Sequence, residues 1–580
     1  MKTLVIVESP NKIKKISEIL GDDYIVVASV GHIVELGKGG HHGIGVDIDN
    51  GFKPRYVLMD DKVNVLKNIH ERIKECDNVV LFCDPDREGA SIAWHVQERI
   101  KDFGKPIKST SSDKLSKKKV LEAFQNLKDI DMNMVRAQEA RRVLDRIVGF
   151  TASPFLSKVE NSTLSAGRVQ SVAVRLVVDR ENDILNFKPE TYYTIDVDLV
   201  KDNKTFKAVF PIKIKNESVA NDIAEIIKKS SFVVKDIEDS VESKNPPAPM
   251  ITSTLQQVMS KLHGFSAEQT MKAAQSLYES GLVSYIRTDS PAASKEDIDD
   301  VRNYLKTNNY KIPKKQNEYK AKSSAQEAHE CIRPVNIHND GNNGFNALSG
   351  DEKKTYDIIW KYFIASQCES AKFSTRKVIF ECSEDSEVKL KSSGKCVLEK
   401  NFMEILDQND DSKIDIPELT IGEVINKSGE VNLQKKKTKP LPRFSLADLI
   451  ADLEKKGICR PSTFADILSK IEKRGYVEKK GNVYHPTELG IKISNLLKDS
   501  FKFMDYNFTS DMENNLDKIA EGKLSYLELL ESFYPDYKKE LTNAYIKANV
   551  DLCKKCNSPM VVIKDKEPFC SNYRNCKKGN

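Results

Sequence analysis

Short apolar runs alternate with amphipathic segments along the first part of the chain. The runs Leu4–Val7 and Asn78–Cys83 have the composition of buried strands, and apolar residues recur at helical spacing in the segments Asn11–Leu20 and Arg87–Ile100 that follow them. This alternation predicts a mostly parallel sheet covered by helices. We therefore expect an α/β domain over residues 1–130.

The hydrophobic period changes after this domain. Helical spacing gives way to alternation at period two, and the proline-rich segment Ser243–Met250 then leads into a long helical stretch, a second β region and a second helical block. Because the β pattern occurs in two pieces that flank a helical segment, it predicts an arch interrupted by another domain. The expected units are a helical one from 131–188 plus 444–549, a β-rich arch from 189–250 plus 372–443, a helical one at 251–371, and a C-terminal unit at 550–580.

Length and composition narrow the functional classes only slightly. At 580 residues the chain is too long for a single core. The net charge of +5 is the small difference between 91 basic and 86 acidic residues, so only local clusters of charge can indicate a partner. No stretch is long and apolar enough for a membrane span, and Leu4–Val7 is too short for the core of a signal peptide. We expect a protein of the cytoplasm, or of a nuclear or viral compartment.

Four of the eleven cysteines lie in the last thirty residues, while the other seven are scattered singly. This distribution fits a reducing compartment and one metal site better than a set of disulfides. The two cysteine pairs flank a β-like segment, as in a tetracysteine zinc ribbon, although the second pair is wider than usual. The predicted Zn²⁺ ligands are Cys553, Cys556, Cys570 and Cys576.

Three acidic residues follow the strand Asn78–Cys83, in the sequence DPDRE. One alternative is that they serve the next helix, with Asp86 as its cap and Glu88 in its first turn, but this leaves Asp84 unexplained. Sites in open α/β sheets form beyond the carboxyl ends of the strands, and clustered carboxylates repel one another unless a cation joins them. We therefore predict a Mg²⁺ site made by Asp84, Asp86 and Glu88.

The first strand ends at the same predicted edge of the sheet, in the sequence VESPNK. Two interpretations of Lys12 are open: an ordinary surface lysine, or a ligand for a phosphate. Glu8 could act as a general acid or base if neighbouring carboxylates raise its pKa. Further along the chain, several helix starts carry arginine beside small or hydroxylated residues, which is typical of solvated caps and equally of phosphate sites. The residues concerned are Ser165, Gly167, Arg168, Gln170, Arg460, Ser462 and Thr463, with the helical pair Arg141 and Asp145.

These segments together resemble a known family. VIVESPNK with DPDREG resembles the Toprim metal-binding domain, and the ordered motifs GHIVEL, ARRVLDRIVGF, LSAGRVQSVAVR, YIRTDS, AQEAHECIRP, CRPSTFA and FTSDMENNLDKIAEG resemble the bacterial-type type IA DNA topoisomerases. The resemblance covers essentially the whole chain. It implies a multidomain α/β and α+β enzyme in which a Toprim domain, helical domains and a β-arch form a toroid around a hole large enough for DNA, followed by the zinc ribbon.

The resemblance also implies a mechanism. Tyr285, in YIRTDS, would attack single-stranded DNA and form a 5′-phosphotyrosine link, so that negatively supercoiled DNA is relaxed by strand passage without ATP. Arg287 would favour the phenolate and neutralise the phosphate, and Glu8 would protonate the departing 3′-oxygen. Lys12 would bind the scissile phosphate, His329 and Arg141 would assist around it, and Arg168 would contact the strand. Mg²⁺, with Glu8 as a possible further ligand, would matter most for resealing.

Further expectations follow from the same resemblance. The enzyme would be an isomerase and a monomer that works on DNA in the cytoplasm (at the bacterial nucleoid, or in a viral or nuclear compartment), without a membrane or a nucleotide cofactor. The zinc ribbon would hold single-stranded DNA.

The sequence departs from the family at Lys114, where an acidic residue is usual, and at Cys331 and Cys459. The glycine-rich loop Gly37–Gly45 lacks the lysine–serine ending of a nucleotide-binding loop. Two other functions remain open: a Toprim nuclease or primase that does not use Tyr285, and a non-catalytic DNA-binding protein.

Overall fold

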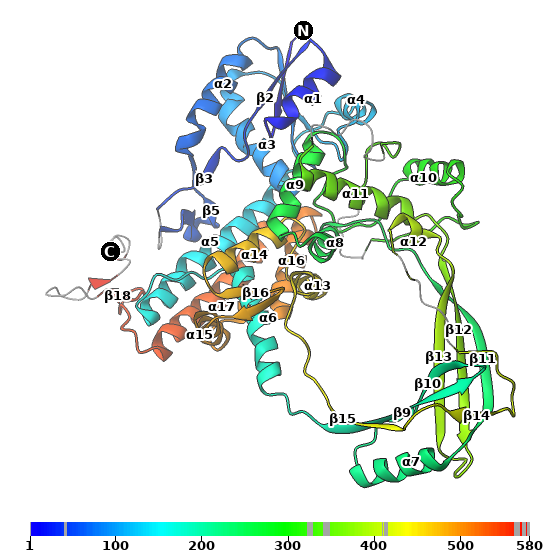
Figure 1. Cartoon of the computed structure of the whole chain (residues 1–580). Helices are drawn as coiled ribbons and strands as arrows, with labels where there is room; N and C mark the ends of the chain where they lie inside the picture. The colour runs from blue at the N-terminus through cyan, green and yellow to red at the C-terminus, as the bar shows by residue number, and fades with distance from the viewer. Residues whose placement is uncertain are drawn as a thin grey trace.

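The chain folds as a ring with a large opening, bounded on one side by helices and on the other by a long β-arch (Figure 1). The computed structural model describes residues 2–39, 43–321, 329–339, 348–408, 410, 416–561, 569–570 and 576. Within these ranges, no helix combines the length and the apolar character that a membrane span requires.

The N-terminal domain is built on a four-stranded parallel sheet in the order β2-β1-β7-β8. Alternation along β1 sends Val5 and Val7 to one face and Leu4 and Ile6 to the other, and each face packs into its own apolar cluster. The strands are β1 (Thr3–Val7), β2 (Tyr24–Ala28), β7 (Asn78–Phe82) and β8 (Ile107–Thr110), and the helices are α1 (Asn11–Leu20), α2 (Val63–Ile73), α3 (Arg87–Ile100) and α4 (Lys117–Gln125). Two small antiparallel pairs accompany them, β3 (Val34–Leu36) with β6 (Tyr56–Leu58) and β4 (Val46–Asp47) with β5 (Lys53–Pro54).

Two segments far apart in the sequence share the largest apolar core. The first contributes α5 (Met132–Glu160) and α6 (Arg168–Leu185). The second contributes α13 (Leu446–Lys455), α14 (Phe464–Lys473), α15 (Glu488–Lys498), α16 (Tyr506–Ala520), α17 (Tyr526–Lys547) and the hairpin of β16 (Val477–Lys480) and β17 (Val483–Pro486). This shared core forms the helical body beside the N-terminal domain in Figure 1.

Both predicted β segments enter one seven-stranded sheet, in the order β10-β13-β12-β11-β14-β9-β15, and β10 also pairs with β9. The strands are β9 (Thr191–Lys201), β10 (Lys204–Val209), β11 (Phe232–Lys244), β12 (Ala371–Cys382), β13 (Lys389–Glu399), β14 (Val424–Lys427) and β15 (Asn432–Lys437), with α7 (Glu217–Lys229) beside them. The long antiparallel pairs β11–β12 and β12–β13 form the arch that curves around the opening.

The helical segment between the two β pieces returns to the N-terminal domain. It consists of α8 (Thr252–His263), α9 (Ala267–Glu279), α10 (Lys295–Thr307) and α11 (Gly350–Ala365), and α12 (Phe402–Ile405) packs on α11. Its residues share an apolar cluster with β1, β7 and α4 of the N-terminal domain. The predicted nucleophile therefore lies next to the predicted carboxylates, although about 200 residues separate them along the chain.

Candidate active site

The carboxyl ends of β1 and β7 lie side by side because Val7 pairs with Phe82 in the parallel ladder. Glu8 and Asp84 therefore leave the sheet at the same edge, as the sequence predicts. Asp86 caps α3, and its Oδ1 accepts a hydrogen bond from the Gly89 amide at 2.8 Å. A side chain at residue 89 would place its Cβ 2.2 Å from the Asp84 carbonyl oxygen, so the tight turn that presents these acids requires glycine.

Asp86 does more than cap the helix. Tyr285, which is 2% exposed, donates its hydroxyl to Asp86 Oδ2. The Tyr285 ring packs edge-on against Tyr278, with the ring centroids 5.3 Å apart, and lies 5.6 Å from the ring of His329. Burial and the Asp86 carboxylate raise the pKa of Tyr285 well above its usual value, and Arg287 only partly opposes them. Arg287 thus acts in the expected direction, toward the phenolate, but burial and Asp86 outweigh it and the protein groups alone hold a neutral phenol.

Arg287 bridges two of the predicted metal ligands. Its Nη1 lies 3.0 Å from Glu88 Oε2 and 3.5 Å from Asp86 Oδ2. A hydrogen bond from His32 and the charge of Arg287 lower the pKa of Glu88 to about 2, against the opposing effect of burial. His32, in the GHIVEL motif, therefore belongs to the site, although its motif alone does not predict a role for it.

Lys12 is buried and forms an ion pair with Asp84. Tyr278 donates its hydroxyl to the same carboxylate, with the oxygens 3.2 Å apart. Burial lowers the pKa of Lys12, but the neighbouring Asp84 more than compensates and the net shift is upward. Lys12 is thus charged and held near the carboxylates.

Glu8 is an acid of this group that stays protonated at neutral pH. Burial, together with the charges of Asp84 and Asp86, raises the pKa of Glu8 to about 8. Its Oε2 is buried and has no hydrogen-bond partner. A protonated carboxyl group with a free buried oxygen is suited to give a proton to a leaving oxygen.

The donor set at this edge suits a hard divalent cation, although its atoms do not converge in the arrangement shown. Among the described residues, the four C-terminal cysteines are the only group of potential ligands whose atoms lie within 4.8 Å of one another. Lys12 and Arg287 instead neutralise the carboxylates. The unpartnered oxygen of Glu8 and the mutual repulsion of Glu8, Asp84 and Asp86 are what a bound cation would relieve, so these residues fit Mg²⁺ by their chemistry.

A pocket of about 390 Å³ opens beside these groups. It brings together several residues that the sequence analysis selected from separate motifs. Arg460 lies in it and pairs with Asp517 at 2.8 Å and with Asn514 at 3.0 Å. The lining residues are Asp86, Arg87, Glu88, Gln138, Arg141, Arg287, Asp289, Arg460, Pro461, Ser462, Thr463, Asp466 and Asp517.

Arg168 is not presented to a ligand. It is 1% exposed, its Nε lies 3.1 Å from Asp145 Oδ1, and its Nη2 lies 2.7 Å from Glu513 Oε1. This geometry contradicts the expected contact between Arg168 and the DNA backbone. Gly167 is the N-cap of α6, and Arg168 is the first residue of that helix.

Other predicted DNA-binding residues line a second pocket, of about 440 Å³. Gln170 accepts a hydrogen bond from Arg474 at 2.9 Å, and Ser165 is held by Arg474 and Tyr476. Arg474 had no motif around it in the sequence. The lining residues are Glu35, Leu36, Arg142, Asp145, Arg146, Gly149, Phe150, Ser153, Ser165, Ala166, Gln170, Lys470 and Arg474.

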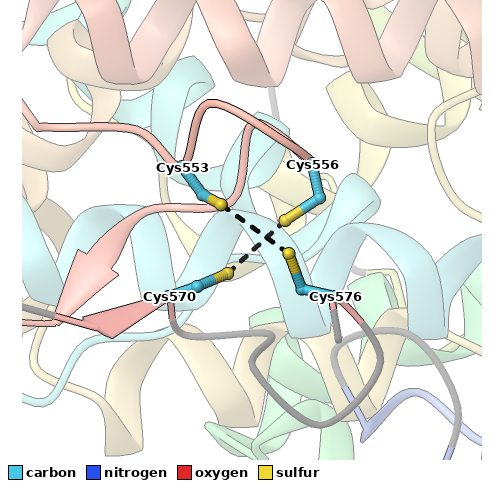
Figure 2. Close-up of side chains that lie close together, drawn as sticks. All are labelled: Cys553, Cys556, Cys570 and Cys576. Carbon is cyan, nitrogen blue, oxygen red and sulfur yellow. Dashed lines mark hydrogen bonds between the residues drawn. The ribbon is translucent and has the colours of Figure 1, made fainter. Parts of the chain in front are cut away.

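The four C-terminal cysteines converge around one point, with β18 (Met560–Val561) and β19 (Phe569–Cys570) beside them (Figure 2). The Sγ atoms of Cys553 and Cys576 are 3.7 Å apart, and those of Cys556 and Cys570 are 3.4 Å apart. Backbone hydrogen bonds from Lys555 and Cys556 lower the pKa of Cys553 to about 6, which favours its thiolate form. Four convergent sulfur atoms suit one tetrahedral zinc ion.

Comparison with known proteins identifies related chains. Residues 129–531 match the family model described as DNA topoisomerase, and residues 3–112 match the Toprim domain. The chain is 38% identical to DNA topoisomerase 1 of Buchnera aphidicola subsp. Acyrthosiphon pisum, over 94% of this chain and 67% of that protein, and 36% identical to DNA topoisomerase 1 of Pseudomonas aeruginosa, over 97% and 70%.

A solved structure has a similar overall fold. The full-length topoisomerase I of Thermotoga maritima superposes with a TM-score of 0.82 at 30% identity, covering 98% of each chain. The predicted fold class is thereby confirmed. The chain belongs to the family of bacterial-type type IA DNA topoisomerases.

Proposed function

We propose that this chain relaxes negatively supercoiled DNA by cleaving one strand with Tyr285, passing another strand through the break and resealing it. The observation that carries the proposal is the hydrogen bond from the buried Tyr285 hydroxyl to Asp86, at the carboxylate-bearing edge of the Toprim sheet. A tyrosine that served only as core filling would not need to meet a charged group from another domain.

The side chains of this site supply each proton movement. As Tyr285 Oη attacks the phosphorus, its proton passes to Asp86, which already accepts its hydrogen bond. The bond from phosphorus to the 3′-oxygen breaks, and Glu8 gives its proton to that oxygen. The phosphate ends as a 5′-phosphotyrosine ester, which stores the energy of the broken bond. In resealing, the 3′-hydroxyl gives its proton to Glu8 and attacks the phosphorus, and Tyr285 leaves and takes its own proton back from Asp86.

Guanidinium groups stabilise the negative charge that develops on the phosphate in the transition state. Arg287, Arg141 and Arg460 line the pocket beside Tyr285, together with Ser462 and Thr463. Their fixed positive charges are suited to stabilising the transferring phosphoryl group. Lys12 joins them once it exchanges Asp84 for the phosphate, and His329 lies against the Tyr285 ring.

Two metal ions complete the proposal. Asp84, Asp86 and Glu88 would hold Mg²⁺, with Glu8 as a possible further ligand, and the ion would neutralise phosphate charge and align the 3′-hydroxyl. Cys553, Cys556, Cys570 and Cys576 would hold a structural Zn²⁺ in a ribbon that binds single-stranded DNA. Action as a monomer, in the cytoplasm and without a nucleotide cofactor, stays a prediction.

Plasmid relaxation tests the proposal. The chain should change the linking number of negatively supercoiled DNA in steps of one, with Mg²⁺ and without ATP. Tyr285→Phe should abolish this activity, whereas Tyr362→Phe, a half-buried tyrosine on α11 of the same domain, should retain it. Nicking without a change in linking number would favour a Toprim nuclease, and binding without either would favour a non-catalytic DNA-binding protein.

A further inference from the structure

The Toprim loop that follows β8 docks onto the domain that carries Tyr285. The Tyr285 amide donates a hydrogen bond to the Asp113 carbonyl at 2.8 Å. The Tyr278 hydroxyl reaches the Ser112 carbonyl at 3.3 Å. The backbone of this loop therefore fixes both the nucleophile and the tyrosine that packs against it.

The next residue of the loop, Lys114, is buried in an acidic pocket of the Tyr285 domain. Its Nζ lies 2.8 and 3.0 Å from the two carboxylate oxygens of Asp297, and 3.7 Å from Glu330 Oε2. Asp297 lies in the first turn of α10, where the Ser294 hydroxyl also donates to it. A lysine is thus recognised at the position where the family usually has an acidic residue.

Lys114 takes part in the charge balance of this pocket. Arg333, which is 1% exposed, pairs with both Asp297 and Glu330. One guanidinium therefore faces two carboxylates, and Lys114 supplies the second positive charge. Burial raises the pKa of Glu330 to about 7, and Lys114 opposes this rise. Withdrawing Lys114 would leave Asp297 and Glu330 to share the single guanidinium of Arg333 in a partly buried site, which is costly.

We propose that Lys114 is an electrostatic latch that holds the Tyr285 domain closed on the Toprim domain and positions the Tyr285 backbone for attack. The inference rests on the proposed function, because a passing strand can enter the ring only if Tyr285 separates from the Toprim sheet. Each opening would draw Lys114 out of its pocket and break the bond between the Tyr285 amide and Asp113.

A second ion pair across the same boundary provides a matched control. Lys118, on α4, pairs with Glu296 at 2.7 Å, but their side chains are 61% and 72% exposed. Exposed pairs of this kind contribute little because water and salt screen them. Lys118→Met removes the same charge from the same domain boundary as Lys114→Met, but from an exposed pair with Glu296 instead of the buried site of Asp297 and Glu330.

Hydrogen exchange at the Tyr285 amide measures the opening directly, in the full chain without DNA. Lys114→Met should raise exchange in the peptide that contains Tyr285 by about tenfold or more, as expected when one partner of a buried pair is removed. Lys118→Met should change it by less than about threefold. Lys114→Arg should restore most of the protection, and Asp297→Asn should raise exchange as Lys114→Met does.

Two further readouts separate a latch from general loss of folding and from failure of the proposed function. Exchange in β12 and β13 of the arch should not change in Lys114→Met. Covalent capture of a short single-stranded oligonucleotide, which requires the closed state, should fall in Lys114→Met and recover in Lys114→Arg. The latch proposal would be overturned if exchange at Tyr285 in Lys114→Met stayed at the wild-type rate, or if exchange in the arch rose by the same factor. Capture that survives Tyr285→Phe would overturn the proposed function and leave the latch standing.

Discussion

Replacing Arg168 by methionine should destabilise the helical body strongly. Both Arg168 and Glu513 have fully buried side chains, and their closest atoms are 2.7 Å apart. Without Arg168, the nearest remaining ion-pair contact of Glu513 is Arg141 Nη1, at 4.0 Å. Removing one partner of a buried pair costs about 3–5 kcal/mol. Because Arg141 stays, we expect the lower end, about 3 kcal/mol, which is roughly a hundredfold change in local opening.

The pKa of Glu513 gives the sign of the pH dependence. Burial raises this pKa, but Arg141, Arg168 and Arg460 together lower it to about 2, below the ordinary value of 4.5. An acid with a lowered pKa contributes stability above its unfolded value and loses it as the pH falls toward the folded value. The stabilisation by Glu513 should therefore be complete above about pH 4.5 and disappear toward pH 2. Arg168→Met should weaken this pH dependence.

Native-state hydrogen exchange in α6 and α16 measures the effect locally, which suits a chain with several domains. The double variant Arg168→Met with Glu513→Leu should recover much of the lost stability, because no buried charge is left unpaired. Lys498→Met is the control, since its pair with Asp179 is partly exposed and should contribute at most about 1 kcal/mol. The reasoning would be refuted if Arg168→Met lowered the free energy of local opening by no more than this control does. It would also be refuted if the double variant were no more stable than Arg168→Met alone.

Three further predictions concern the metal ions and the acid. Because burial and neighbouring carboxylates raise the pKa of Glu8 to about 8, cleavage of an oligonucleotide in excess chelator should slow as the pH rises through about 8; a pH profile that Glu8→Gln leaves unchanged would exclude this role. Asp86→Asn should raise the Mg²⁺ concentration needed for half-maximal resealing, and an unaltered titration would remove Asp86 from the metal site. Cys570→Ser should abolish stoichiometric Zn²⁺ in elemental analysis and weaken binding of single-stranded DNA; full zinc content would contradict the tetracysteine site.

The carboxylate edge could be predicted because it depends on local order in the sequence. Glu8 and Asp84 each follow an apolar strand, and parallel strands deliver such residues to the same edge. The N-cap of α3 could also be predicted from the sequence. The hydrogen bond from Tyr285 to the other oxygen of Asp86 could not, because 199 residues separate the two.

The roles of individual arginine and lysine side chains are harder to predict, because their partners lie far along the chain. Arg168 opens a helix after a glycine, and such a helix start can hold a phosphate, but Glu513, 345 residues away, binds it inside the protein. The sequence shows Lys114 as a departure from the family pattern. Its acidic pocket on α10 and beside Arg333 appears only after the Tyr285 domain has folded against the Toprim domain.

The most direct test of the central claim is the chemical identity of the trapped protein–DNA link. A single-stranded oligonucleotide labelled at either end would be incubated with the chain, denatured and separated. We predict that the 3′-labelled fragment stays on the protein, that the 5′-labelled fragment is released, and that mass spectrometry places the phosphate on the peptide containing Tyr285. Retention of the 5′ label, an adduct on another residue, or an adduct in Tyr285→Phe would contradict the account.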